Sequence, residues 1–210
     1  LSTGESSAGP SGNIIVRAGT SGSDSAGDVR IVAGETSSIC GAGSVCMRGG
    51  TSVGGNGGAV SICGGASTGC GDGGVLILQS GESRSQTTGS AMFGSAAGIS
   101  SGDVHVSTGV STAAKSGCLS LETGTAENGA AGSIAIGVGA GAGTTGGHFA
   151  MVGGDVSGGD SMGGQFLLSA GSGHSGGGVT IKGGNSAGED AGSVRLTEGA
   201  GKMGGAHLSM

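Results

Sequence analysis

The chain has 210 residues, of which 56 are glycine, none is tryptophan or tyrosine, and only 10% are charged, a composition that excludes an ordinary globular domain. The net charge of −6 and the scattered basic residues indicate no electrostatic surface for nucleic acid. No apolar run approaches the length of a membrane span, and no signal peptide is evident.

The glycines are periodic, which a disordered chain would not show. The stretch 27–34 reads Gly-Asp-Val-Arg-Ile-Val-Ala-Gly, or Gly-x-h-x-h-x-x-Gly, where h is aliphatic or aromatic. We call such a stretch an apolar segment, and we call its first and last residues the leading and closing glycines. The residues between a closing glycine and the next leading glycine are called a connector. All fourteen copies have the leading glycine, whereas the degenerate copy from Gly89 has Ala96 at the closing position. This regularity predicts a repeat architecture.

The paired h residues alternate with variable residues, which is typical of a strand with one buried face. A helix would need apolar residues three and four apart and far fewer glycines. We therefore expect the h pairs to point inward and to stack as two columns. The predicted core residues are Ile14, Val16, Val29, Ile31, Val60, Ile62, Leu76, Leu78, Val104, Val106, Leu119, Leu121, Ile134, Ile136, Phe149, Phe166, Leu168, Val179, Ile181, Val194 and Leu196; Val45, Met47, Ala91, Phe93 and Met151 complete the pairs.

The glycines that flank the segments are expected at the corners of each coil, where a turn with φ > 0 or a crowded turn favours glycine; ordinary backbone dihedrals there would leave close packing as the reason. The predicted turn glycines are Gly12, Gly27, Gly43, Gly58, Gly74, Gly102, Gly117, Gly132, Gly147, Gly164, Gly177 and Gly192. Between the closing and the next leading glycine the step is most often eight residues, and it varies while the apolar segment does not. Small residues such as Ser52 and Ala131 near the ends of the connectors predict a thin coil whose second wall is looser.

These features predict an all-β fold: a parallel β-solenoid (β-helix) of about 14 coils of about 15 residues, with a thin, flattened cross-section and no caps. It is expected to occupy residues 1–210 as one continuous array. Leu1 falls at a second h position, and a truncated copy beginning at Gly204 places Leu208 at another. We therefore expect an excerpt of a longer array, or a unit that abuts identical neighbours, with continuation end to end.

No catalytic, cofactor-binding or metal site is predicted. Asp103 and His105 would share an outward face, but the repeat places no nucleophile beside them, which favours solvated surface. A calcium array needs aspartates at one fixed offset in successive turns. Asp24, Asp72 and Asp160 fall at different offsets from the next leading glycine, so they form no ladder.

The five cysteines form no C-x-x-C motif. In a solenoid, Cys46 and Cys63 would point outward with Cα atoms roughly 8 Å apart, beyond comfortable disulfide reach. Free thiols and cross-links between neighbouring chains both remain open. Outward side chains predicted as lateral contacts, unless they are merely scattered surface residues, are Ile15, Cys46, Cys63, Val75, Ile77, Met92 and Leu167.

Stretches such as 116–124 (Ser-Gly-Cys-Leu-Ser-Leu-Glu-Thr-Gly) and 131–139 (Ala-Gly-Ser-Ile-Ala-Ile-Gly-Val-Gly) resemble Gly/Ser-rich arrays in very large surface or secreted proteins of unicellular algae and other protists. The resemblance implies an extracellular or cell-surface structural role and carries over no functional residue. The predicted function is a structural repeat segment of an extracellular filament or surface fibre built by stacked coils. Its expected partners are copies of itself or continuing repeats, end to end and sideways. The alternative is an ice- or calcium-binding β-solenoid module, although the middle outward column contains a single threonine, Thr180.

Overall fold

The computed structural model describes residues 1–23, 25–158 and 161–199. The chain divides into two units, Leu1–His105 and Val106–Met210, which are described separately. Neither unit contains a helix or a β-strand in the described residues. The predicted β-solenoid is therefore wrong. The truncated copy from Gly204, with Leu208, lies outside the described residues, as do Asp24 and Asp160.

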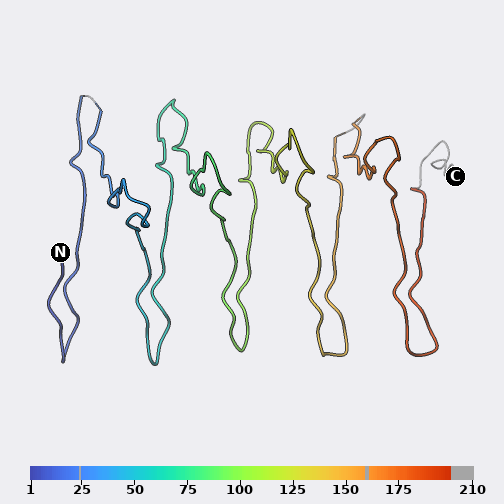
Figure 1. Ribbon diagram of the computed structural model, residues 1–210, viewed down its shortest axis with the longest axis horizontal. Helices are drawn as coiled ribbons and strands as arrows, with labels where there is room; N and C mark the ends of the chain where they lie inside the picture. Colours follow the sequence, from blue (N-terminus) through green and yellow to red (C-terminus); the bar gives the residue numbers. More distant parts are fainter. Residues whose placement is uncertain (24, 159–160, 200–210) are drawn as a thin grey trace. The chain divides into compact units, whose positions relative to one another are not determined.

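The repeat nevertheless governs the path of the chain in both units. Extended stretches alternate with bends, and every bend lies in a connector (Figure 1). The bends occupy residues 7–9, 22–23, 37–40, 53–55, 68–71, 84–86 and 98–100 in the first unit, and 112–114, 127–129, 142–145, 158, 173–175 and 187–189 in the second. The apolar segments are thus extended, as their alternation predicts, but they are not paired into a sheet.

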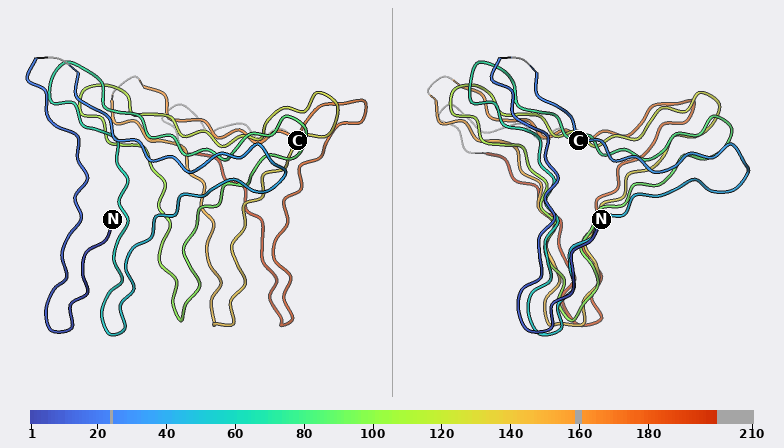
Figure 2. Two further views of the ribbon diagram at one scale, coloured as in Figure 1. Left: turned by 60° about the vertical axis from the view of Figure 1, so that its left-hand side comes forward. Right: turned by 90° about the vertical axis from the view of Figure 1, so that its left-hand side faces the viewer.

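Within each unit the connectors form narrow loops that project in three directions in succession (Figure 2). In the first unit, the loops around 7–9, 53–55 and 98–100 share one direction, and the loops between them take the other two. One full turn of the chain therefore takes three repeats, whereas the solenoid interpretation assigned one repeat to each turn.

This winding explains why consecutive apolar segments do not pair with one another. A strand exists only where its N–H and C=O groups meet those of a neighbour. Successive apolar segments lead toward different loops, and no backbone hydrogen bond joins the interiors of two segments in the described residues. The alternation of h residues correctly predicted extended backbone, but the prediction that neighbouring segments pair into a sheet was wrong.

The predicted apolar columns are not formed either. In the described part of the chain no hydrophobic side chain is buried, from Ile14 and Val16 in the first complete segment to Val194 and Leu196 in the last. A column requires a second wall and coils in contact, and a turn made of three divergent repeats supplies neither. The predicted core residues are exposed apolar residues in this chain.

The alternation survives as a difference in exposure. The first h residue of each segment is about half exposed, between 49% for Val179 and 57% for Phe166. Apolar residues between the two h positions are more open, with Ile77 at 74% and Ile15 at 81%. The second h residues range from 50% to 80% exposed, so the greater protection lies at the first h position.

Candidate functional site

In the described part of the chain, a contact recurs where connectors begin and end. In seven repeats, the N–H of a leading glycine donates to the carbonyl oxygen of the preceding closing glycine, over 2.8 to 3.1 Å. We call this junction the neck of the connector. The bonded pairs are Gly43 with Gly34, Gly58 with Gly50, Gly74 with Gly65, Gly89 with Gly81, Gly164 with Gly154, Gly177 with Gly171, and Gly192 with Gly184.

The neck absorbs the variation in connector length. The connector between Gly154 and Gly164 is the longest and that between Gly171 and Gly177 is short, yet their bonds measure 2.8 and 2.9 Å. Insertions are therefore confined to the loop beyond the neck. This accounts physically for the observation that connectors vary in length whereas apolar segments do not.

The residue just before the closing glycine, here called the penultimate residue, packs into the neck. It is small in most repeats, and it includes every half-buried residue of the described chain; all other described residues are exposed. These half-buried residues are Ala18, Ala33, Gly49, Ser80 and Gly183. Sequence reasoning did not single this position out, although its small size was visible in most copies.

Close packing, not a left-handed turn, explains the leading glycines. None of the described glycines has φ between +20° and +160°, so the expected φ > 0 corners are absent. A Cβ added to Gly58 would lie 2.9 Å from the backbone nitrogen of Gly50, and one on Gly164 would lie 2.8 Å from that of Gly154. Among the described leading glycines only Gly102 has open space at this point.

The closing glycines, in contrast, face open space. A Cβ on Gly50, Gly65 or Gly154 would meet nothing within 4 Å. This asymmetry matches the sequence, because Ala96 replaces a closing glycine while no copy replaces the leading one. Sterics at the neck thus explain which glycine tolerates a side chain.

The size of the penultimate side chain also correlates with the presence of the hydrogen bond at the neck. All four necks with a penultimate glycine, at Gly49, Gly64, Gly153 and Gly183, have the bond. The four with threonine or valine there, at Thr3, Thr108, Thr123 and Val138, lack it. In those four repeats a methyl group of the penultimate side chain faces the leading glycine, for example Thr123 Cγ2 at 3.4 Å from the position of a Cβ on Gly132. A branched side chain holds the two backbones apart.

Beyond the neck, a serine two residues after the closing glycine fastens the bend. Its Oγ accepts a hydrogen bond from a backbone N–H two or three residues later, an arrangement that serine favours in turns. The pairs are Ser6 with Gly9 (3.2 Å), Ser52 with Gly55 (2.9 Å), Ser83 with Gln86 (3.0 Å), Ser111 with Ala114 (3.1 Å) and Ser186 with Gly188 (2.9 Å). These serines were visible in the sequence, but they were interpreted only as small residues that make the coil thin. Their role as hydrogen-bond acceptors in the bends was not predicted.

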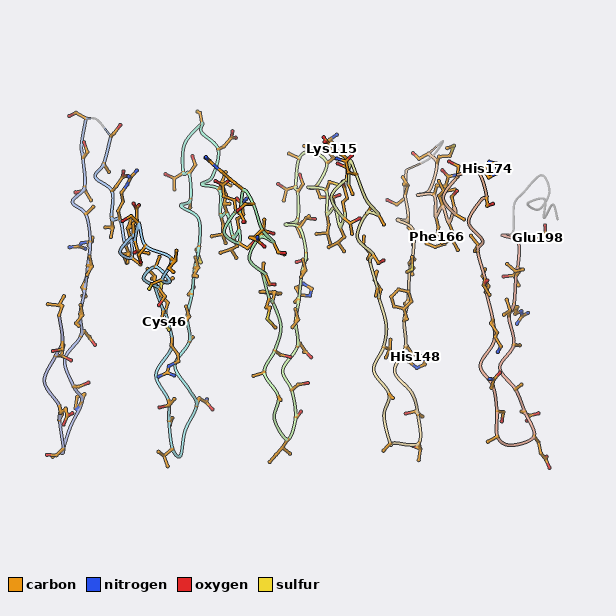
Figure 3. The ribbon with its side chains drawn as sticks, viewed as in Figure 1. Cys46, Lys115, His148, Phe166, His174 and Glu198 are labelled. Carbon is orange, nitrogen blue, oxygen red and sulfur yellow. The ribbon has the colours of Figure 1, made fainter. Side chains whose placement is uncertain are left out.

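The predicted lateral contacts are all on exposed positions. Ile15, Val75, Ile77, Met92 and Leu167 are at least 74% exposed. Cys46 and Cys63 are exposed free thiols, as are the other three cysteines, and Cys63 Sγ lies 3.5 Å from Ser61 Oγ. Side chains project singly from the extended stretches, as Cys46 and His148 show in Figure 3. The structure thus places these residues on solvated, extended backbone.

Chemistry-bearing groups are dispersed. No group of three or more His, Cys, Asp or Glu side chains that could hold a metal ion occurs in residues 1–23, 25–158 and 161–199. Ser120 donates a hydrogen bond to the carboxylate of Glu122 within one segment. Asp103 and His105 are both exposed. The described geometry therefore assembles no catalytic constellation.

Charge is divided between the two halves of the repeat. The connectors hold ten of the fourteen acidic residues and three of the eight basic ones, whereas the apolar segments hold four acidic and five basic residues. The loops therefore carry a net −7 and the segments a net +1, which together give the −6 of the chain. The segments are nearly neutral surfaces framed by acidic loops.

Comparison with protein families, with curated proteins and with solved structures finds no match to this chain. Nor does the described part of the chain include a helix with the length and apolarity required to cross a bilayer. Function must therefore be argued from the repeat and its surface.

Proposed function

We propose that the chain is a structural protein, a repeat segment of an extracellular filament or surface fibre that associates with copies of itself or with continuing repeats. The observation that carries the proposal is the exposed apolar pair that recurs in every complete repeat. A solitary soluble chain gains nothing from presenting a pair of exposed apolar side chains in every complete repeat. Association with copies of the same surface would bury these recurring apolar pairs.

The neck supports the same proposal. It holds the base of each loop with backbone groups and small residues, so the repeat is propagated without a hydrophobic core. Loop length varies without altering the neck, which lets an array lengthen or diversify while its apolar segments keep one spacing. A repeated scaffold with variable loops suits a structural array better than a single-site binding protein.

Neither alternative function gains support from a specific feature. An ice-binding module of the predicted type needs a flat sheet face, and the described residues form no sheet. A calcium module needs carboxylates gathered at one place, and the described carboxylates are dispersed. The extracellular location follows from the resemblance in repeat style and remains a prediction.

The proposal is tested on the purified chain by sedimentation velocity and negative-stain electron microscopy over a wide concentration range. We expect association that increases with concentration and elongated particles. A species that remains a 19.1 kDa monomer at every concentration would refute the structural proposal. Antibody labelling of intact source cells against permeabilised ones checks the surface location.

A further inference from the structure

The apolar segments present unused backbone hydrogen-bonding groups. The backbone–backbone hydrogen bonds of the described residues lie at the necks, between closing and leading glycines. The N–H and C=O groups inside segments such as 27–34 and 132–139 therefore have no backbone partner among the described residues. An extended stretch in this state resembles the edge of a sheet, which readily accepts another strand.

The exposed surface shows how much covering the chain needs. Its accessible area is 20,782 Å². A folded monomer of this mass would expose about 8,400 Å² and a fully unfolded chain about 28,000 Å². The chain by itself therefore buries only about a quarter of its unfolded surface, whereas a folded domain of this size buries about 70%. Most of the remaining burial must therefore come from contact with other molecules. The surface exposed in excess of a folded monomer is several times the area buried in a standard protein interface.

A second copy of the same chain fits this surface in three respects. Each apolar segment has the same length, so several can pair at once in one register. Each has one apolar side and one mixed side, so pairing brings aliphatic pairs such as Ile134 and Ile136 together on one face. The segments carry nearly balanced charge, four acidic and five basic residues, so like segments do not repel as a group.

We infer that the apolar segments are strand donors and acceptors between chains: they form β-sheet only when segments of different copies of this chain pair with one another. This inference rests on the proposed structural function and specifies its contact. The necks hold the loops away from the paired segments, and the acidic loops remain in solvent. Sheet in this protein is then a property of the assembly rather than of the single chain.

The test compares the intact chain with two variants, each with six introduced prolines. The first places proline at the middle of six apolar segments, where it removes an N–H that no backbone acceptor uses in the single chain. These substitutions are Ile15→Pro, Ile77→Pro, Ala135→Pro, Ala150→Pro, Leu167→Pro and Thr180→Pro. The matched control places proline in connectors, where Pro10 already occurs. Its substitutions are Ala66→Pro, Ala97→Pro, Ala113→Pro, Ala126→Pro, Ala140→Pro and Ala187→Pro.

Association is measured by sedimentation, and sheet content by amide I infrared absorption, over the same concentration series. We expect sheet content of the intact chain and the control to rise with association, and the segment variant to need at least a tenfold higher concentration. Fibres without a sheet signal would overturn the inference but leave the structural function intact. Sheet that persists in the diluted monomer would also overturn it, because pairing would then be within one chain. Absence of any association would refute both proposals.

A second measurement does not depend on the variants. Fibres grown from mixtures of ¹³C-carbonyl-labelled and unlabelled chains are examined by isotope-edited infrared spectroscopy. If paired strands come from different chains, vibrational coupling between labelled strands falls as the labelled fraction is diluted. Coupling that is unchanged by dilution would place the partners in one chain and contradict the inference.

Discussion

The neck gives a prediction that can be worked out at a single residue. Gly49 is the penultimate residue of its segment, and a Cβ placed on it would lie only 2.0 Å from the carbonyl oxygen of Gly58. Ordinary contact begins near 3.4 Å, so Gly49→Ala must move the two backbones apart by about 1.4 Å. The bond from the Gly58 N–H to the Gly50 carbonyl is 2.9 Å long and does not survive that movement. The expected loss is about 1 kcal/mol at this neck.

The assay is amide hydrogen exchange measured by NMR at the Gly58 N–H. A loss of about 1 kcal/mol corresponds to roughly fivefold faster exchange at that amide. Gly50→Ala is the matched control, because its Cβ would meet nothing within 4 Å although it lies in the same neck. Gly54→Ala, which is equally open, controls for the loop. Equal exchange in Gly49→Ala and Gly50→Ala would refute the steric explanation of the neck.

Three further predictions concern the neck, the loop and the charge. Thr123→Gly removes the methyl that faces Gly132, so a new bond from the Gly132 N–H to the Gly124 carbonyl is expected, seen as slower exchange at Gly132; unchanged exchange would contradict the correlation with penultimate bulk. Ser83→Ala removes the acceptor for the Gln86 N–H, so exchange at Gln86 should accelerate by a few fold while the next neck stays unaffected. Because the loops carry the net negative charge, raising sodium chloride from low to physiological concentration should screen their repulsion and lower the concentration needed for association; stronger association at low salt would show that ion pairs, not apolar segments, hold the chains together.

The sequence allowed the repeat to be predicted, but not the partner of each segment. Alternation at Val29 and Ile31 depends on neighbouring residues, and the extended backbone found there follows from that local pattern. Pairing depends on where the next segment lies in space, which the turn at each connector decides. Glycine-rich connectors encode that direction weakly, because glycine permits many backbone conformations. The fifteen-residue period was therefore visible while the three-repeat turn was not.

The leading glycines show a similar limit of prediction from sequence: their constancy was visible, but its physical reason was not. The leading glycine was recognised as the most constant feature, and a left-handed turn was the first explanation offered for it, with crowding as the alternative. The structure gives the reason as contact with the penultimate residue and the backbone of the preceding segment. Two signals in the sequence pointed there: small residues before most closing glycines, and Ala96 at a closing position. Both concern packing between positions six to eleven residues apart, which a search for turn residues does not examine.

The two halves of the repeat divide the physical work. At the neck, small residues allow backbone to contact backbone, so the loop is closed without burying a large side chain. In the apolar segment, aliphatic residues are retained although none of those that the structure describes is buried in the single chain. If those residues served only a soluble monomer, the solvated serines and threonines of the connectors would serve equally well there. Their recurrence in every complete repeat, beside unpaired backbone groups and nearly balanced charge, is accounted for when the surface that buries them belongs to another copy of the chain.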